Sequence, residues 1–263
     1  QLVKRCRLML IGQSGAGKTT LIHRLRYNKF SNFGSTDGID LSIVDVKDIP
    51  FTVFDFAGQK EYEHTHILFF NSEALYLGVH DPNMEDMHEL QRYLNMIQNC
   101  APTAPLIMIT TRALQKSSNK LLLPIARQYP DKIRSMLAID SYDGTGIEAL
   151  KAELIKAATS EPLASHTMHN LLNIHDQFYN HLISNYASEN RYFTTTDMIL
   201  NRKFSLSFEE IVSIGMNIGL KDRDDVKLAL DLFCKWGYFF RLSNDDIVLK
   251  PQQLADIFAR VFT

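Results

Sequence analysis

The sequence predicts an α/β domain, in which a mostly parallel sheet is covered by helices on both faces, followed by a smaller α-rich domain. Three observations support this prediction. Short apolar runs alternate with segments of helical periodicity through residues 1–160. This alternation is typical of a parallel sheet whose strands are joined by crossover helices. A glycine-rich loop joins the first apolar run to the first helical segment. After Ser160-Glu161-Pro162 longer helical patterns replace the alternation, so a second domain is expected at residues 161–263.

The elements of the first domain can be assigned in chain order. Short apolar or alternating runs predict strands, which are expected at Arg7–Ile11, Ile39–Val46, Phe51–Phe54, Ala74–Val79, Leu106–Thr110 and Ser135–Ile139. Apolar residues spaced three and four apart predict helices, which are expected at Thr19–Tyr27, Met84–Asn99, Ser118–Gln128 and Ile147–Ala158.

The second domain has the periodicity of helices and one hairpin. Helices are expected at Met168–Ala187, Phe208–Ile218, Asp224–Trp236 and Pro251–Phe262. The runs Phe239–Leu242 and Ile247–Leu249 predict a hairpin between the last two helices. The connection near Pro162 is not a Gly/Ser-rich flexible linker, so we expect the second domain to pack on the first through apolar surface.

The composition is that of a globular protein with an apolar core. The hydrophobic fraction is 45% and the charged fraction 22%, which excludes wholesale disorder. A net charge of −2 provides no basic field, so neither nucleic acid nor an anionic membrane is expected as the main partner. No segment approaches the roughly 20 apolar residues of a transmembrane helix.

The cysteines and the first residue indicate the setting of the chain. Cys6, Cys100 and Cys234 lie far apart and form no disulfide framework, which favours a reducing, cytoplasmic compartment. The chain does not begin with Met, so we expect it to be a piece of a longer protein.

Residues Gly12–Thr19 fit the phosphate-loop pattern G-x-x-x-x-G-K-[ST] completely, between a predicted strand and a predicted helix. Glycines let the backbone direct its N–H groups at phosphate oxygens, and the helix adds the positive end of its dipole. Lys18 should reach the β- and γ-phosphates, and the Thr19 hydroxyl should bind Mg²⁺. The alternative is a glycine-rich turn with an exposed lysine. The expected phosphate-binding residues are Gly12, Ser14, Gly15, Ala16, Gly17, Lys18, Thr19 and Thr20.

A phosphate loop of this kind works with an acidic residue at the end of a neighbouring strand, which holds the hydrated Mg²⁺. Asp55 follows the apolar run Phe51–Phe54 and has that place. The Gly58 N–H can approach the γ-phosphate, and the amide of Gln59 could orient an attacking water. Lys18 and Gln59 are therefore the expected catalytic residues.

The segments Asp55-Phe56-Ala57-Gly58-Gln59 and Ala74-Leu75-Tyr76-Leu77-Gly78-Val79 resemble the Roc domain of the Roco proteins, which include the leucine-rich-repeat kinases. The resemblance implies a Ras-like P-loop GTPase fold with a mixed, mostly parallel sheet, binding GTP or GDP with Mg²⁺. Thr36-Asp37-Gly38-Ile39-Asp40 resembles the first switch of the family, T-x-G-I. Thr36 would then be the second hydroxyl on Mg²⁺, rather than an ordinary polar loop residue.

The second domain resembles the first part of the COR domain of the same family. The resemblance rests on Ile247–Asp256, an apolar run followed by Pro-x-x-Leu, and on Ala229–Phe233 with Gly237. It implies that the chain stops about halfway through COR, without the part credited with dimerisation. The implied partners are the adjoining COR segment, flanking domains that could include a kinase, and a second copy in the full-length protein.

The segment that should identify guanine departs from the family pattern. GTPases identify guanine with [NT]-K-x-D or, in Roc domains, with T-H-x-D, and this motif is expected at the end of the strand Leu106–Thr110. This chain has Thr111-Arg112-Ala113-Leu114 there. Leu114 stands where the aspartate would accept guanine N–H groups, so we expect weak discrimination among purines. Ser141 and Tyr142 begin a loop that resembles the family's S-A-K base loop with changes.

Two hypotheses of different classes follow. In the first, the chain is an active but slow GTPase switch that passes its nucleotide state to the COR segment and to the rest of a multidomain signalling protein; Gln59 favours it. In the second, it is a non-hydrolysing nucleotide-binding or structural scaffold with degenerate base recognition; Leu114 favours that one. A third class, an ATPase or kinase active site within the chain, is not favoured, because neither H-R-D nor D-F-G occurs, so any kinase would lie outside it.

Overall fold

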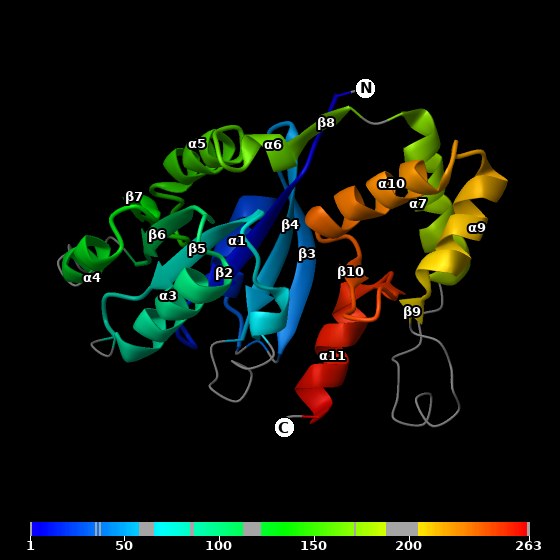
Figure 1. Ribbon diagram of the computed structural model, residues 1–263. Helices are drawn as coiled ribbons and strands as arrows, with labels where there is room; N and C mark the ends of the chain where they lie inside the picture. Colours follow the sequence, from blue (N-terminus) through cyan, green and yellow to red (C-terminus); the bar gives the residue numbers. More distant parts are fainter. Residues whose placement is uncertain are drawn as a thin grey trace.

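A computed structural model describes residues 2–34, 36, 38–57, 66–84, 87–112, 122–170, 172–187 and 205–261. Its centre is a six-stranded sheet in the order β3-β4-β2-β5-β6-β7 (Figure 1). The strands are β2 (Cys6–Ile11), β3 (Ile39–Val46), β4 (Ile49–Phe56), β5 (Ala74–His80), β6 (Leu106–Thr110) and β7 (Ile133–Ala138). Only the edge strand β3 is antiparallel to its neighbour among these described strands, so the sheet is mixed and mostly parallel, as predicted.

Helices cover both faces of this sheet. On one face, α1 (Lys18–Tyr27) and α5 (Ile147–Ala158) pack on the side of the sheet that carries Leu8 and Leu10. On the other, α3 (His88–Cys100) and α4 (Leu122–Gln128) pack on the side that carries Met9. Strand β2 is buried along its whole length, and because successive residues point to opposite faces, its side chains pack into both layers; all of them except Arg7 are apolar.

The second part of the chain has its own core and also shares the core of the sheet. Helices α7 (Asn173–Tyr186), α9 (Phe208–Ile218) and α10 (Arg223–Lys235) enclose one apolar cluster. Helix α11 (Pro251–Val261) runs along β3 instead (Figure 1). Leu254 and Ala255 of α11 belong to the same buried cluster as Phe54 and Leu94. The expected apolar packing of the second domain on the first is therefore present.

The predicted helix at Met168–Ala187 is wrong at its beginning. A short helix α6 (Ala164–Thr167) is followed by strand β8 (Met168–Asn170), which pairs antiparallel with β1 (Leu2–Lys4). The local apolar spacing was helical, but the distant β1 supplies a strand partner, and tertiary pairing overrides local periodicity. The hairpin of β10 (Phe240–Arg241) and β11 (Ile247–Val248) is confirmed and gains a third strand, β9 (Ser205–Leu206).

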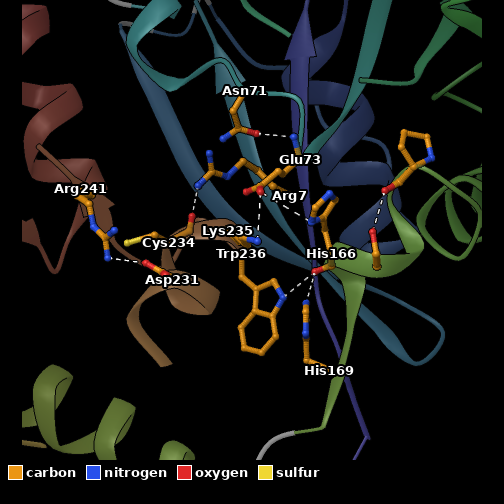
Figure 2. A network of polar contacts seen from close by, with 12 residues as sticks. Arg7, Asn71, Glu73, His166, His169, Asp231, Cys234, Lys235, Trp236 and Arg241 are labelled. Carbon is orange, nitrogen blue, oxygen red and sulfur yellow. Dashed lines mark hydrogen bonds and ion pairs between the residues drawn. The ribbon is translucent and has the colours of Figure 1, made fainter. Parts of the chain in front are cut away.

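A polar network joins the two parts where α10 ends against the sheet (Figure 2). The buried Arg7 of β2 donates to the Cys234 carbonyl near the C-terminal end of α10 and lies over the Phe54 ring. Lys235 pairs with Glu73 at 3.3 Å, and the Trp236 indole N–H donates to the His166 carbonyl at 3.2 Å. Among the described residues, no helix is long and apolar enough to cross a membrane.

Candidate functional site

The predicted phosphate loop connects β2 to α1, and its backbone depends on glycine. Gly12, Gly15 and Gly17 have φ values of 139°, 75° and 93°, a region that L side chains rarely adopt. A Cβ at Gly12 would also lie 2.1 Å from the Val79 carbonyl oxygen. Helix α1 begins at Lys18 with no side-chain cap, so the N–H groups of its first turn point toward the loop without helical partners.

Lys18 lies inside this loop. Its ammonium donates to the carbonyl oxygens of Gly12 at 2.7 Å and Gln13 at 2.9 Å. Burial lowers the pKa of Lys18 to about 8, while the nearby Asp55 carboxylate opposes that shift. The side chain is only 5% exposed, so the alternative of a turn with a solvated lysine does not describe the structure. The charge is held where phosphate oxygens would meet the loop.

The three predicted metal ligands meet although they come from separate segments. The Thr19 hydroxyl donates to Asp55 Oδ2 at 2.6 Å and lies 2.8 Å from the Thr36 hydroxyl. Asp55 is 2% exposed, and burial raises its pKa to about 6. Its second oxygen, Oδ1, is buried without a hydrogen-bond partner. Two hydroxyls and an orphaned carboxylate oxygen form an all-oxygen donor set, which fits Mg²⁺.

A cavity of about 290 Å³ lies beside the phosphate loop. Its walls come from the loop, from the segment after α1 and from the ends of β6 and β7, and the lining residues are Ala16, Gly17, Thr20, Phe30, Asn32, Thr111, Arg112, Asp140, Ser141 and Tyr142. A second cavity over the phosphate loop, lined by Lys18, Thr19 and Thr36 among others, shares Gly17 and Arg112 with it. A ligand could therefore extend from the phosphate loop into this neighbouring cavity, which we call the base cavity.

The two residues expected at the base segment are positioned by contacts to the phosphate loop and to β5. The Thr111 hydroxyl donates to the carbonyl oxygens of Ala16 at 3.0 Å and His80 at 3.2 Å. Arg112 pairs with the buried Asp81 at 2.7 Å and has a positive φ of 52°. Thr111 and Arg112 line the cavity together with Ser141 and Tyr142, and the role of these four residues in binding the base stays a prediction.

Three further residues of the cavity were missed from the sequence. Phe30 and Asn32 follow α1, and the Phe30 ring lies edge-on to Tyr142 at 5.2 Å between centroids. An aromatic residue in the polar segment Asn28–Asn32 was the available signal. Asp140 directly precedes the predicted base loop and lines the same cavity. Gly58, Gln59 and Leu114 lie outside the described residues.

The region that contains the phosphate loop and the predicted metal ligands matches known proteins. Residues 7–113 match the family described as "Ras of Complex, Roc, domain of DAPkinase". The probable serine/threonine-protein kinases pats1 and roco11 of Dictyostelium discoideum are 26% identical over 185 residues and 27% identical over 183 residues. A solved structure titled "Structure of methanosarcina barkeri Roco2 RocCORdC bound to GDP" has a TM-score of 0.72 at 20% identity and covers 96% of this chain.

Residues 7–113 are thus similar to Roc domains, and the chain is similar to Roco proteins over a longer stretch. It also shares 25% identity over 164 residues with the Ras-related protein Rab-26 of Rattus norvegicus, covering 60% of this chain and 63% of that protein. The Roco relatives are far longer, because the alignments cover 57% and 60% of this chain but 6% of pats1 and 12% of roco11. The Methanosarcina chain is covered to 74% and shows the same fold, a Ras-like Roc domain joined to COR.

Proposed function

We propose that this chain is a guanine-nucleotide switch that binds GTP and GDP with Mg²⁺ and hydrolyses GTP slowly. The observation that carries the proposal is the meeting of Thr19, Thr36 and Asp55 beside the buried Lys18. These residues come from α1, the first switch and the end of β4. Side chains from three separate segments form the donor set that a hydrated Mg²⁺ and a triphosphate require.

Each group has a distinct task when nucleotide is bound. Thr19, Thr36 and Asp55 would hold Mg²⁺, which neutralises charge on the β- and γ-phosphates. The loop N–H groups and Lys18 would bind the phosphate oxygens, and Thr111 keeps the base segment against the loop through its bond to the Ala16 carbonyl. Gln59, three residues after β4, would orient the attacking water. Unaided members of this class turn over at about 10⁻⁴ to 10⁻² per second.

The nucleotide state would reach residues 161–263, which we propose to be the N-terminal part of COR, through β3. Thr36 precedes β3 by three residues, and Gln252 of α11 bonds the outer edge of that strand at Ile39 and Leu41. Loss of the γ-phosphate would release Thr36 and change this contact. In a longer protein the signal would pass to flanking domains, which could include a kinase, and to a second copy of the chain.

Calorimetric titration of GDP and a GTP analogue in Mg²⁺ tests nucleotide binding. Lys18→Ala should abolish measurable binding, because Lys18 supplies the charge-assisted bonds to phosphate. Lys156→Ala is the matched control, since Lys156 lies on the surface of α5 with its side chain 73% exposed. Both variants should keep the parent's circular dichroism. Equal affinity of parent and Lys18→Ala would remove the central claim.

The second candidate function is a scaffold that binds nucleotide without turning it over. It is favoured by Leu114, which cannot accept the guanine N–H groups. Single-turnover measurement of GTP cleavage separates the two candidates. Mg²⁺-dependent cleavage by the parent supports the switch, whereas tight binding with no cleavage supports the scaffold.

A further inference from the structure

Asp140 places a carboxylate in the wall of the base cavity. It is 6% exposed and follows β7 by two residues. Its backbone N–H donates to the Thr145 carbonyl at 2.9 Å, and its own carbonyl accepts from the Gly144 N–H at 2.9 Å. Its Oδ1 accepts the Tyr142 backbone N–H at 2.8 Å. The two backbone bonds hold the main chain at Asp140, and the third holds one oxygen of its side chain.

Among the described residues, no group donates a hydrogen bond to the other carboxylate oxygen, Oδ2. Two arginines of the described residues make their bonds elsewhere: Arg112 pairs with Asp81 at 2.7 Å, and Arg24 donates to the Asp143 carbonyl at 3.0 Å. A carboxylate can only accept hydrogen bonds, and a largely buried one needs a donor. The cavity wall therefore presents an acceptor that a ligand can satisfy.

The rest of the cavity suits a flat ring. Phe30 and Tyr142, which are 44% and 73% exposed, line the cavity together with Arg112. Aromatic faces and an arginine plane are the groups on which a planar base stacks. The ligand defined by these walls is a planar ring with N–H donors on one edge.

We propose that Asp140 reads the base of the bound nucleotide and supplies the guanine recognition that Leu114 cannot. The inference rests on the proposed nucleotide binding. Guanine offers adjacent donors at N1 and N2, hypoxanthine offers N1 alone, and adenine turns an acceptor, N1, toward the carboxylate. The affinity order is accordingly guanine, then hypoxanthine, then adenine. Asp140 would thus give the protein a preference for guanine, whereas Leu114 alone led us to expect weak discrimination among purines.

Asp140→Asn tests the assignment because it should change which hydrogen-bonding groups on the edge of the base the protein recognises. Asparagine keeps the oxygen that accepts from Tyr142 but replaces the free oxygen with an N–H donor. Xanthine carries a carbonyl where guanine carries the N2 amino group, so the variant should bind xanthosine diphosphate better than the parent does. We expect GDP affinity to fall about ten- to a hundredfold. Calorimetry with both diphosphates gives the two changes.

Asp143→Asn is the matched control from the same loop. Asp143 accepts from the Thr145 N–H and hydroxyl and does not line the cavity, so GDP and xanthosine diphosphate should bind as they do to the parent. Asp140→Asn with unchanged affinities for both would overturn the proposal. The parent offers a test that needs no variant, because equal affinity for GDP, inosine diphosphate and adenosine diphosphate also overturns it. A parent that binds none of them would instead refute the nucleotide switch itself.

Discussion

The side-chain amide of Gln252 bonds the outer edge of β3 as another strand would. Its Oε1 accepts the Leu41 N–H at 2.8 Å and its Nε2 donates to the Ile39 carbonyl at 2.7 Å. Edge strands expose such groups, and proteins cover or pair them to prevent unwanted association. Here a helix from the second part of the chain pairs the edge next to the first switch.

We expect Gln252→Leu to weaken this connection. Leucine fills similar space but leaves two backbone groups of β3 without their protein partner, which should lower the free energy of unfolding by about 1–3 kcal/mol. Gln253→Leu is the control, since the Gln253 side chain makes no hydrogen bond among the described residues. Urea denaturation measures the stability, and hydrogen exchange should show faster exchange of the Leu41 amide in the Gln252 variant alone. Equal effects of the two substitutions would contradict this role for Gln252.

The metal site makes a separate prediction. Asp55→Asn keeps an acceptor for the Thr19 hydroxyl. It removes the negative charge of the carboxylate and changes Oδ1, the oxygen that has no hydrogen-bond partner in the described structure. Loss even of an outer-shell metal partner costs about 10–100-fold in affinity, so GDP affinity in Mg²⁺ should fall by at least about tenfold. EDTA should then weaken GDP binding to the parent but have little further effect on the variant. Asp45→Asn, at an exposed position of β3, should respond to EDTA as the parent does; an EDTA response retained by Asp55→Asn would argue against the site.

Hydrolysis should depend on Gln59. Gln59→Leu removes the amide that would orient water while leaving the phosphate loop and the metal ligands intact. Single-turnover cleavage should fall clearly, whereas GDP affinity should stay near that of the parent. An unchanged cleavage rate would mean that another group positions the water.

The sequence predicted the parts of the site that are locally encoded. The phosphate loop needs glycine at positive φ and a lysine at the helix start, and Asp55 needs an apolar strand before it, so both leave a contiguous pattern. Asp140 leaves no such pattern, and Phe30 leaves only a single aromatic residue in a polar segment, because their role arises only where separate segments meet around one cavity. The same limit explains the missed pairing of β1 with β8, which lie more than a hundred and sixty residues apart. The base preference expected from the sequence rested on Leu114 and did not include Asp140, which lines the base cavity.

The last prediction concerns the way the two parts of the chain unfold. Leu254 of α11 is 4% exposed and lies in the apolar cluster that also contains Phe54 of the sheet. Leu254→Ala should lower the free energy of unfolding by about 2–5 kcal/mol, through lost burial and the cavity left behind. Leu228→Ala, on α10 with 55% exposure, should change it by no more than about 0.5 kcal/mol.

The fluorescence of the sole tryptophan, Trp236, can be used to follow this unfolding. Trp236 is 2% exposed, belongs to the core of the second part, and donates to the His166 carbonyl at 3.2 Å. Its fluorescence reports the second part, while far-UV circular dichroism reports helices and strands of the whole chain. Because the two parts share buried apolar surface, both signals should change at one urea concentration, and Leu254→Ala should shift both midpoints downward together. Two separated transitions in the parent, or equal shifts for Leu254→Ala and Leu228→Ala, would show that the second part is not docked through this cluster.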